Sequence, residues 1–204
     1  MKARLIRIAA ASVLAIAVSA GIAWWQVRNA ATTVESGTKT AVPIGGPFTL
    51  TDNRGRAVTD ADFRGKYMLI YFGYTYCPDV CPTELGVMTQ ALDQLGPKAA
   101  QVQPVFITVD PDRDTVAHMS DYVALFHPRL VGLTGTAEQV REAARAYRVY
   151  YAKAPQKDAK PEDYLMDHSS FIYLMGPDGK FVGVYPGGTA ADKIVQDLSG
   201  RIAG

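Results

Sequence analysis

The sequence predicts an α/β fold in which helices cover a central mixed sheet. Two apolar runs, residues 66–74 and 102–110, carry this prediction, because continuous runs of this kind are typical of strands buried on both faces of a parallel sheet. A segment with apolar residues at helical spacing lies between them. A strand, a helix and a second strand in succession indicate a βαβ unit, whose strands run parallel.

The next elements follow from local signals. Residues 48–59 show period-two patterning around an Asn-Arg-Gly turn, which predicts two paired strands. The helix after the first buried strand is expected to start near Pro82, because proline suits the first helical position. A second helix is expected over 116–126, and a third starts at a capping box formed by Thr136 and Gln139.

The C-terminal part is predicted to form a hairpin and a helix. Apolar stretches at 169–175 and 181–185 flank a Gly-Pro-Asp-Gly sequence that favours a tight turn. The last helix is expected from Ala190 to Arg201. The hairpin adds an antiparallel edge to the parallel strands, and this order of elements is that of a thioredoxin-like fold.

The composition indicates one globular domain. The chain has 204 residues, of which 48% are hydrophobic and 20% are charged, and this is enough to bury a core. The formal net charge is +1 and the basic residues are scattered, so the charge gives no basis for binding nucleic acid. The two cysteines are too few to crosslink a domain of this size, and their role is therefore expected to be chemical.

Residues 1–28 are predicted to be an N-terminal transmembrane helix that anchors the protein. An uncharged apolar run covers residues 8–27 and, at about 1.5 Å per residue, reaches roughly 30 Å, the thickness of a bilayer's hydrocarbon core. Trp24 and Trp25 close the run and basic residues precede it, which places the N-terminus in the cytoplasm. The alternative is a signal peptide cleaved after Ala20.

Residues 29–47 are predicted to form a flexible linker. They lack apolar periodicity and are rich in Thr, Gly and Pro. A single domain is expected over residues 48–204. With either an anchor or a cleaved signal peptide this domain leaves the cytoplasm, so its thiols meet an oxidising compartment.

The two cysteines, Cys77 and Cys81, lie where the first buried strand meets the first long helix. Cys81 directly precedes Pro82 and is expected at the N-cap, where unpaired N–H groups and the helix dipole favour thiolate over thiol. The spacing permits a disulfide, and it also lets two thiolates converge on one ion. Thiolates favour Cu(I) or Zn, and a site with few ligands favours Cu(I). A purely structural bridge would close a short loop and stabilise the fold little.

A further metal ligand could come from the three histidines. His118 lies off the apolar stripe of its helix and is expected on the solvated surface. His127 precedes Pro128 at a helix end, a position that needs no functional explanation. His168 stands before a buried strand and follows a charged, proline-containing loop, residues 153–163. From the residues alone, His168 is either a polar strand start or a ligand on a mobile edge.

The stretch VDPDRDT, residues 109–115, holds three carboxylates and an arginine. We expect Asp112 or Asp114 to cap the following helix. A paired-carboxylate acid/base site is the alternative interpretation.

Five stretches carry a family likeness: FGYTYCPDVCPTEL, VDPDRDT, LVGLTGT, ARAYRVYY and DHSSFIYLMGPDG. In their order and spacing they resemble the Sco (SenC) family of copper chaperones for cytochrome c oxidase assembly. The resemblance covers essentially all of residues 47–200, and the N-terminal anchor fits as well. The set of motifs is far more specific than the cysteine spacing alone.

The resemblance implies a thioredoxin-like domain tethered to the bacterial cytoplasmic membrane and facing the periplasm or the cell exterior. It implies one copper ion, Cu(I) or Cu(II), bound by Cys77, Cys81 and His168. The implied partners are cytochrome c oxidase subunit II, other copper carriers and thiol reductants. We also expect the two cysteines to interconvert between dithiol and disulfide, and a disulfide cannot hold Cu(I).

Two other functions could use the same cysteines. A thiol–disulfide oxidoreductase that acts on extracytoplasmic proteins needs only Cys77 and Cys81, so indifference to the loss of His168 would favour it. A thiol peroxidase would turn over peroxide robustly with a single essential cysteine.

Overall fold

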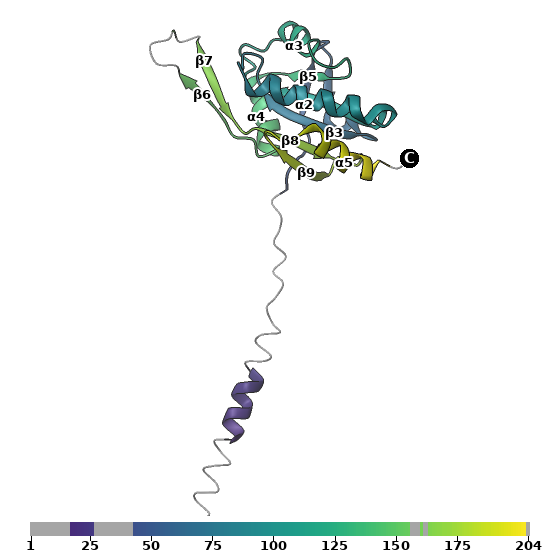
Figure 1. Cartoon of the computed structure of the whole chain (residues 1–204). Helices are drawn as coiled ribbons and strands as arrows, with labels where there is room; N and C mark the ends of the chain where they lie inside the picture. Colours follow the sequence, from purple (N-terminus) through teal and green to yellow (C-terminus); the bar gives the residue numbers. More distant parts are fainter. Residues whose placement is uncertain (1–16, 27–42, 156–159, 161–162, 203–204) are drawn as a thin grey trace, which may run out of the picture. The chain divides into compact units, whose positions relative to one another are not determined.

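Seven strands form one mixed sheet in the computed structural model, which describes residues 17–26, 43–155, 160 and 163–202 (Figure 1). The strand order is β2-β1-β5-β4-β3-β8-β9. The three central neighbours β5, β4 and β3 run parallel, and the remaining neighbours pair antiparallel. The predicted α/β class with a central mixed sheet is confirmed.

The structure fixes the bounds of each element. The strands are β1 (Thr49–Asp52), β2 (Ala57–Thr59), β3 (Tyr67–Gly73), β4 (Val102–Thr108), β5 (Val131–Thr134), β6 (Tyr151–Pro155), β7 (Tyr164–His168), β8 (Phe171–Met175) and β9 (Phe181–Pro186). The helices are α2 (Val80–Leu95), α3 (Val116–Val123), α4 (Ala137–Ala146) and α5 (Ala191–Arg201), with 3₁₀ turns η1 (Asp60–Phe63) and η2 (Gly96–Gln101).

The N-terminal unit is described only over residues 17–26, which form a helix with every residue exposed. Within the described ranges, every helix falls short of the length or hydropathy that crossing a membrane requires. The predicted anchor and linker, residues 1–28 and 29–47, lie largely outside the described residues.

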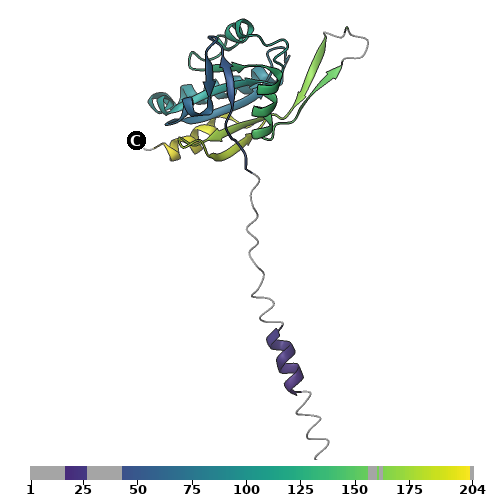
Figure 2. The ribbon, with the colours of Figure 1, turned by 180° about the vertical axis from the view of Figure 1, so that it is seen from behind.

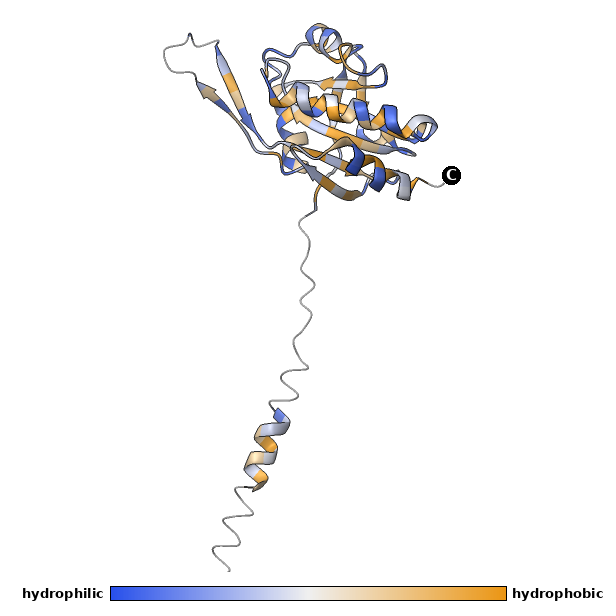
Figure 3. Cartoon of the chain, in the orientation of Figure 1, coloured by the Kyte–Doolittle hydropathy of each residue, from blue (hydrophilic) through white to orange (hydrophobic). Residues whose placement is uncertain are grey.

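The two faces of the sheet bury different helices. Side chains alternate between the faces of a strand. On one face, Phe106 of β4 packs against Tyr122 of α3, with ring centroids 5.6 Å apart, and α2 packs beside α5. The other face is covered by α4 (Figure 2), and there Phe72 of β3 packs against Tyr147 at the end of that helix, with ring centroids 5.4 Å apart. Because both faces are covered, the central strands are mostly hydrophobic, as Figure 3 shows.

Most of the predicted elements are present. The capping box of Thr136 and Gln139 starts α4, and the turn between β8 and β9 is closed by a hydrogen bond from the Gly179 N–H to the Gly176 carbonyl. Two strand regions were missed. β5 has only four residues, and one of them is Gly132.

The second missed region is the β6–β7 hairpin. Residues 153–163 were predicted as a loop, which is wrong for Lys153–Pro155, because these residues belong to β6 and pair with β7. The two strands form a sheet of their own that projects from the side of the domain (Figures 1 and 2).

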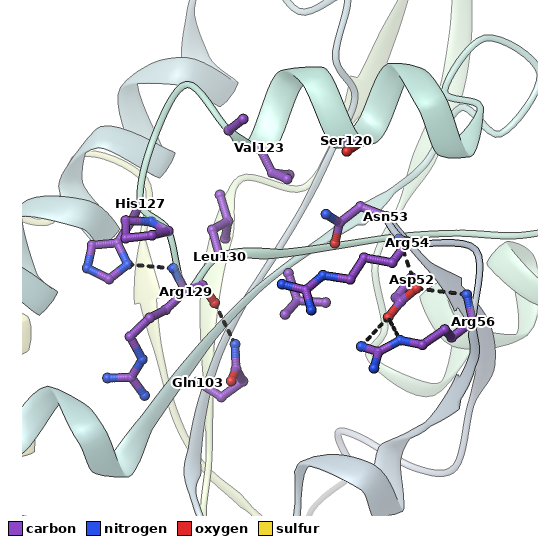
Figure 4. A pocket seen from close by; sticks show the side chains of 13 residues that line it. Asp52, Asn53, Arg54, Arg56, Gln103, Ser120, Val123, His127, Arg129 and Leu130 are labelled. Carbon is purple, nitrogen blue, oxygen red and sulfur yellow. Dashed lines mark hydrogen bonds and ion pairs between the residues drawn. The ribbon is translucent and has the colours of Figure 1, made fainter.

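A polar hollow of about 600 Å³ lies at the end of the sheet away from the cysteines; Figure 4 shows its lining residues. Gln103 in its lining pairs with Met68, near the start of β3. The cysteines follow the other end of the same strand. Two of the arginines in the lining are paired within the protein: Arg56 binds Asp52, and Arg129 donates to backbone carbonyls. The hollow is therefore separate from the cysteine site.

Candidate metal centre

The cysteine loop connects the end of β3 to the start of α2. The Cys77 N–H donates to the Tyr74 carbonyl at 3.3 Å, which closes a turn in the loop. Helix α2 begins at Val80 with Asp79 as its N-cap, so the predicted N-cap position of Cys81 is wrong. Cys81 is the second helical residue, and Pro82 fits in the third position because first-turn N–H groups have no partner within the helix.

Although the helix starts earlier than predicted, an unpaired N–H of its first turn still reaches a cysteine sulfur. The Cys81 N–H, which has no acceptor within the helix, donates to Cys77 Sγ at 3.4 Å. The sulfur of Cys77 therefore accepts one of the unpaired amides of the first turn. Such a contact favours the thiolate of Cys77, whereas the sequence placed the thiolate at Cys81, so that prediction is wrong.

His168 is the last residue of β7 rather than the first residue of the following strand. Its Nδ1 lies 3.1 Å from the Ser169 carbonyl oxygen, which can only accept, so Nδ1 carries the proton. Nε2 then presents a lone pair, and it lies 3.4 Å from Cys81 Sγ. A ring nitrogen fixed in this tautomer by a backbone carbonyl is the usual arrangement of a metal-binding histidine.

The three residues named from the sequence come together. Sγ of Cys77, Sγ of Cys81 and one ring nitrogen of His168 all lie within 4.8 Å of one another. An ion with bonds of about 2.0–2.3 Å joins ligand atoms that lie up to about 4.6 Å apart, so the three atoms stand close to the separation that one ion requires. Both cysteines are buried and free, and His168 is half-buried. The donor set, two thiols and one imidazole, fits a soft metal ion.

The other two histidines lie outside this cluster. His118 is half-buried, because its ring stacks on Tyr76 with centroids 4.9 Å apart, which corrects the prediction of a solvated side chain. His127 follows α3 and its Nδ1 accepts from the Arg129 N–H at 3.1 Å. Neither belongs to the group of potential ligands found among the described residues.

The two cysteines share one proton unequally. The hydrogen bond from Cys81 lowers the pKa of Cys77 to about 3, against the opposing effect of burial. The pKa of Cys81 is raised, chiefly because its thiol donates to Cys77 and secondly because it is buried. In the reduced, metal-free protein Cys77 is therefore a thiolate and Cys81 a thiol.

Several residues that the sequence did not single out shape the site. A Cβ at Gly73 would lie 2.8 Å from Cys81 Sγ, so only glycine lets the helix approach the strand here. The Tyr71 hydroxyl lies 3.9 Å from Cys81 Sγ, and the rings of Tyr71 and Tyr74 meet the His168 ring edge-on at 6.1 and 5.9 Å. In the sequence, the only sign that Tyr71, Gly73 and Tyr74 shape the site was the aromatic run before the cysteines.

The carboxylates of VDPDRDT hold loops in place. Thr115 caps α3, so the predicted cap by Asp112 or Asp114 is wrong. Asp114 is fully buried and accepts hydrogen bonds from Thr75 of the cysteine loop and from Thr108.

The remaining two carboxylates have separate partners. Asp110 binds Arg113 and accepts from the Tyr164 hydroxyl, and exposed Asp112 pairs with Lys153. The three groups therefore do not form a paired-carboxylate acid/base site.

Comparisons with known proteins agree with this geometry. The sequence profile of the SCO1/SenC family matches residues 36–203. The chain belongs to the SCO1/SenC family. It is 50% identical over 160 residues to "Protein SCO2 homolog, mitochondrial" of Bos taurus, a match that covers 78% of this chain and 59% of that protein. The chain thus spans less than two thirds of the length of this curated relative.

Two solved structures of the family hold the expected metal. Arabidopsis thaliana ScoI with copper bound has 44% identity and a TM-score of 0.73, and the match covers 78% of this chain and 98% of that one. Bradyrhizobium japonicum ScoI with copper bound has 46% identity and a TM-score of 0.71, covering 78% and 99%. The prediction of copper is confirmed at the level of these relatives.

The unequal sharing of the proton predicts a specific titration. In the reduced, metal-free protein one thiolate should persist from neutral pH downward and disappear only as the pH falls towards about 3. The ultraviolet absorbance of the thiolate measures this. In Cys81→Ala the main stabilising hydrogen bond is lost, so the pKa of Cys77 should rise towards the ordinary value of about 8.5. A wild-type thiolate that titrates near that ordinary value would contradict the proposed sharing.

Proposed function

We propose that Cys77, Cys81 and His168 bind one copper ion. The observation that carries this proposal is the convergence of their three ligand atoms within 4.8 Å. Two thiolates suit Cu(I), and the imidazole also suits Cu(II), so one site could accept both oxidation states. Zinc in structural sites almost always takes four ligands, and this group among the described residues supplies three.

We further propose that the protein serves the binuclear copper centre of cytochrome c oxidase subunit II. The SCO1/SenC family comprises copper-binding proteins of cytochrome c oxidase assembly. In this role the domain either delivers copper to subunit II or prepares the thiols of that centre. It would exchange with other copper carriers and with thiol reductants.

A redox disulfide between Cys77 and Cys81 is part of this proposal. Its support is the contact of the two residues and the thiolate character of Cys77. Oxidation removes two electrons and the remaining thiol proton from the pair, passes the electrons to an oxidised partner, and leaves a disulfide without thiolate ligands. Cu(I) binding and the disulfide state are thereby mutually exclusive.

The same thiolate supports a second candidate, a thiol–disulfide oxidoreductase. Cys77 has the lowered pKa of an attacking thiol, and Cys81 lies beside it as the resolving thiol. This function needs no third ligand. The two candidates therefore differ in what they require of His168.

Residues 1–28 are proposed to anchor the protein in the bacterial cytoplasmic membrane, with the domain in the periplasm or outside the cell. The uncharged run over residues 8–27 and the basic residues before it support this orientation. The full-length protein should stay in the membrane fraction after a carbonate wash. A mature N-terminus at Gly21 would instead show a cleaved signal peptide.

The copper site is tested by anaerobic titration of the reduced protein with Cu(I) and Cu(II), in competition with zinc. We expect one copper ion per protein in the dithiol form and none as Cu(I) in the disulfide form. His168→Ala should lower the Cu(I) affinity by at least about tenfold, equivalent to about 1.4 kcal/mol, and largely abolish stable Cu(II) binding.

His118→Ala and His127→Ala are the matched controls, because both side chains lie outside the cluster. They should leave copper binding unchanged. An unaltered Cu(II) spectrum and affinity in His168→Ala would defeat the three-ligand site and favour the oxidoreductase.

A further inference from the structure

Arg113, in the loop between β4 and α3, is a buried cation that the metal site described above does not use. Only 18% of its side chain is exposed. Its guanidinium carbon lies 3.7 Å from the ring centroid of Tyr164 and 4.6 Å from that of Tyr76. Its Nη1 donates to the Tyr164 carbonyl at 3.0 Å, and its Nε donates to Asp110. A planar cation that stacks on rings and donates in a fixed fork is chemistry specific to arginine.

The contact with Tyr164 reaches the strand that carries His168. Tyr164 begins β7 and His168 ends it. Side chains at alternate positions share one face of a strand, so Tyr164, Met166 and His168 point to the same side. The Tyr164 hydroxyl also donates to Asp110 at 2.8 Å, which ties the ring and the arginine to the same carboxylate. Fixing Tyr164 therefore fixes the face of β7 that presents the histidine.

The contact with Tyr76 reaches the cysteine loop. Tyr76 directly precedes Cys77, and its ring also stacks on His118 at 4.9 Å. The ring centroid of Tyr74, in the same loop, lies 5.8 Å from the guanidinium carbon of Arg113, and this ring meets the His168 ring edge-on. One cation thus joins the strand of the histidine to the loop of the first cysteine.

The hairpin depends on such side-chain contacts for its position. β6 and β7 pair only with each other and not with the seven-stranded sheet. A two-stranded hairpin alone is marginally stable in water. The hydrogen bonds between Tyr150 and Ser169 at its base join the two arms to each other and not to the seven-stranded sheet. Arg113 contacts Tyr164 near the opposite end of β7 and attaches the hairpin to the rest of the domain there.

We propose that Arg113 is a positioning residue of the metal site. By joining Tyr164 to Tyr76, its guanidinium sets the distance between His168 and the two cysteines. Arg113 does not touch the metal and acts through the hairpin. The proposal is tested by copper binding, which rests on the proposed function, and by hydrogen exchange of the metal-free protein, which does not.

The metal-free test measures amide hydrogen exchange in the reduced protein. In Arg113→Ala, the amides of Tyr164–His168 should exchange faster, and those of β3 and β4 should keep wild-type rates. Tyr164→Ala removes the same contact from the other side and should give the same pattern. The double variant should exchange no faster in β7 than either single variant, because all three lack one shared interaction.

The copper test uses Cu(II) affinity and the Cu(II) spectrum. Arg113→Ala should lower the affinity about 10–100-fold, the usual effect of losing a residue that orients a ligand. Arg113→Lys should not restore it, because lysine keeps the charge but lacks the planar fork. Lys153→Ala is the matched control: its ammonium lies 4.5 Å from the centroid of the same Tyr164 ring, but 52% of its side chain is exposed, and its loss should change neither readout.

Three results would overturn the proposal. One is wild-type exchange in β7 for both Arg113→Ala and Tyr164→Ala. Another is exchange that rises equally in β3, β4 and β7, which would mark a general loss of stability. The third is an effect of Lys153→Ala as large as that of Arg113→Ala. If wild-type protein binds no Cu(II) through His168, the proposed function fails, and hydrogen exchange still decides the role of Arg113.

Discussion

The contact between Cys81 Sγ and His168 Nε2, at 3.4 Å, joins two residues 87 positions apart, and the geometry of the site depends on it. The sheet brings them together, because β3 leads into the cysteine loop and pairs with β8, which follows the histidine. Gly73 then lets Cys81 come close, since any Cβ there would meet its sulfur. The burial of residues 68–73 of β3 fixes the strand beside which this sulfur lies.

The three proposed ligands differ in how firmly the protein holds them. Cys81 is fully buried and protonated, so metal uptake must release its proton. Cys77 is already a thiolate and offers a soft anionic ligand at neutral pH. His168 comes from a separate hairpin and is half-buried. Two of the proposed ligands therefore lie on the central domain and one on a projecting hairpin.

The sequence predicted secondary structure correctly where a regular pattern of apolar residues or a capping motif marks the element. The runs that became β3 and β4, the apolar stripe of α2 and the capping box at Thr136 all predicted their elements, because burial on a strand or a helix leaves a clear periodicity. The three potential ligands were also named in advance, with His168 chosen through the family resemblance. Their convergence needed the structure, because it depends on strand pairing across distant residues.

The errors came from short elements and from tertiary contacts. β5 is too short to show a period, and β6 includes a Lys-Ala-Pro sequence typical of a loop. Asp114 was expected to cap a helix because that is what a local pattern favours. In the structure its carboxylate is taken by Thr75 and Thr108, which come from other parts of the chain.

The central claim is that one copper ion is held by two sulfurs and one imidazole nitrogen. X-ray absorption spectroscopy of the copper-loaded, reduced protein tests this most directly, because it identifies the atoms bound to the metal and their distances. We predict two sulfur ligands at about 2.3 Å and one nitrogen at about 2.0 Å, with the multiple-scattering pattern of a histidine ring. A copper shell of sulfur alone, or one dominated by oxygen and nitrogen, would contradict the account.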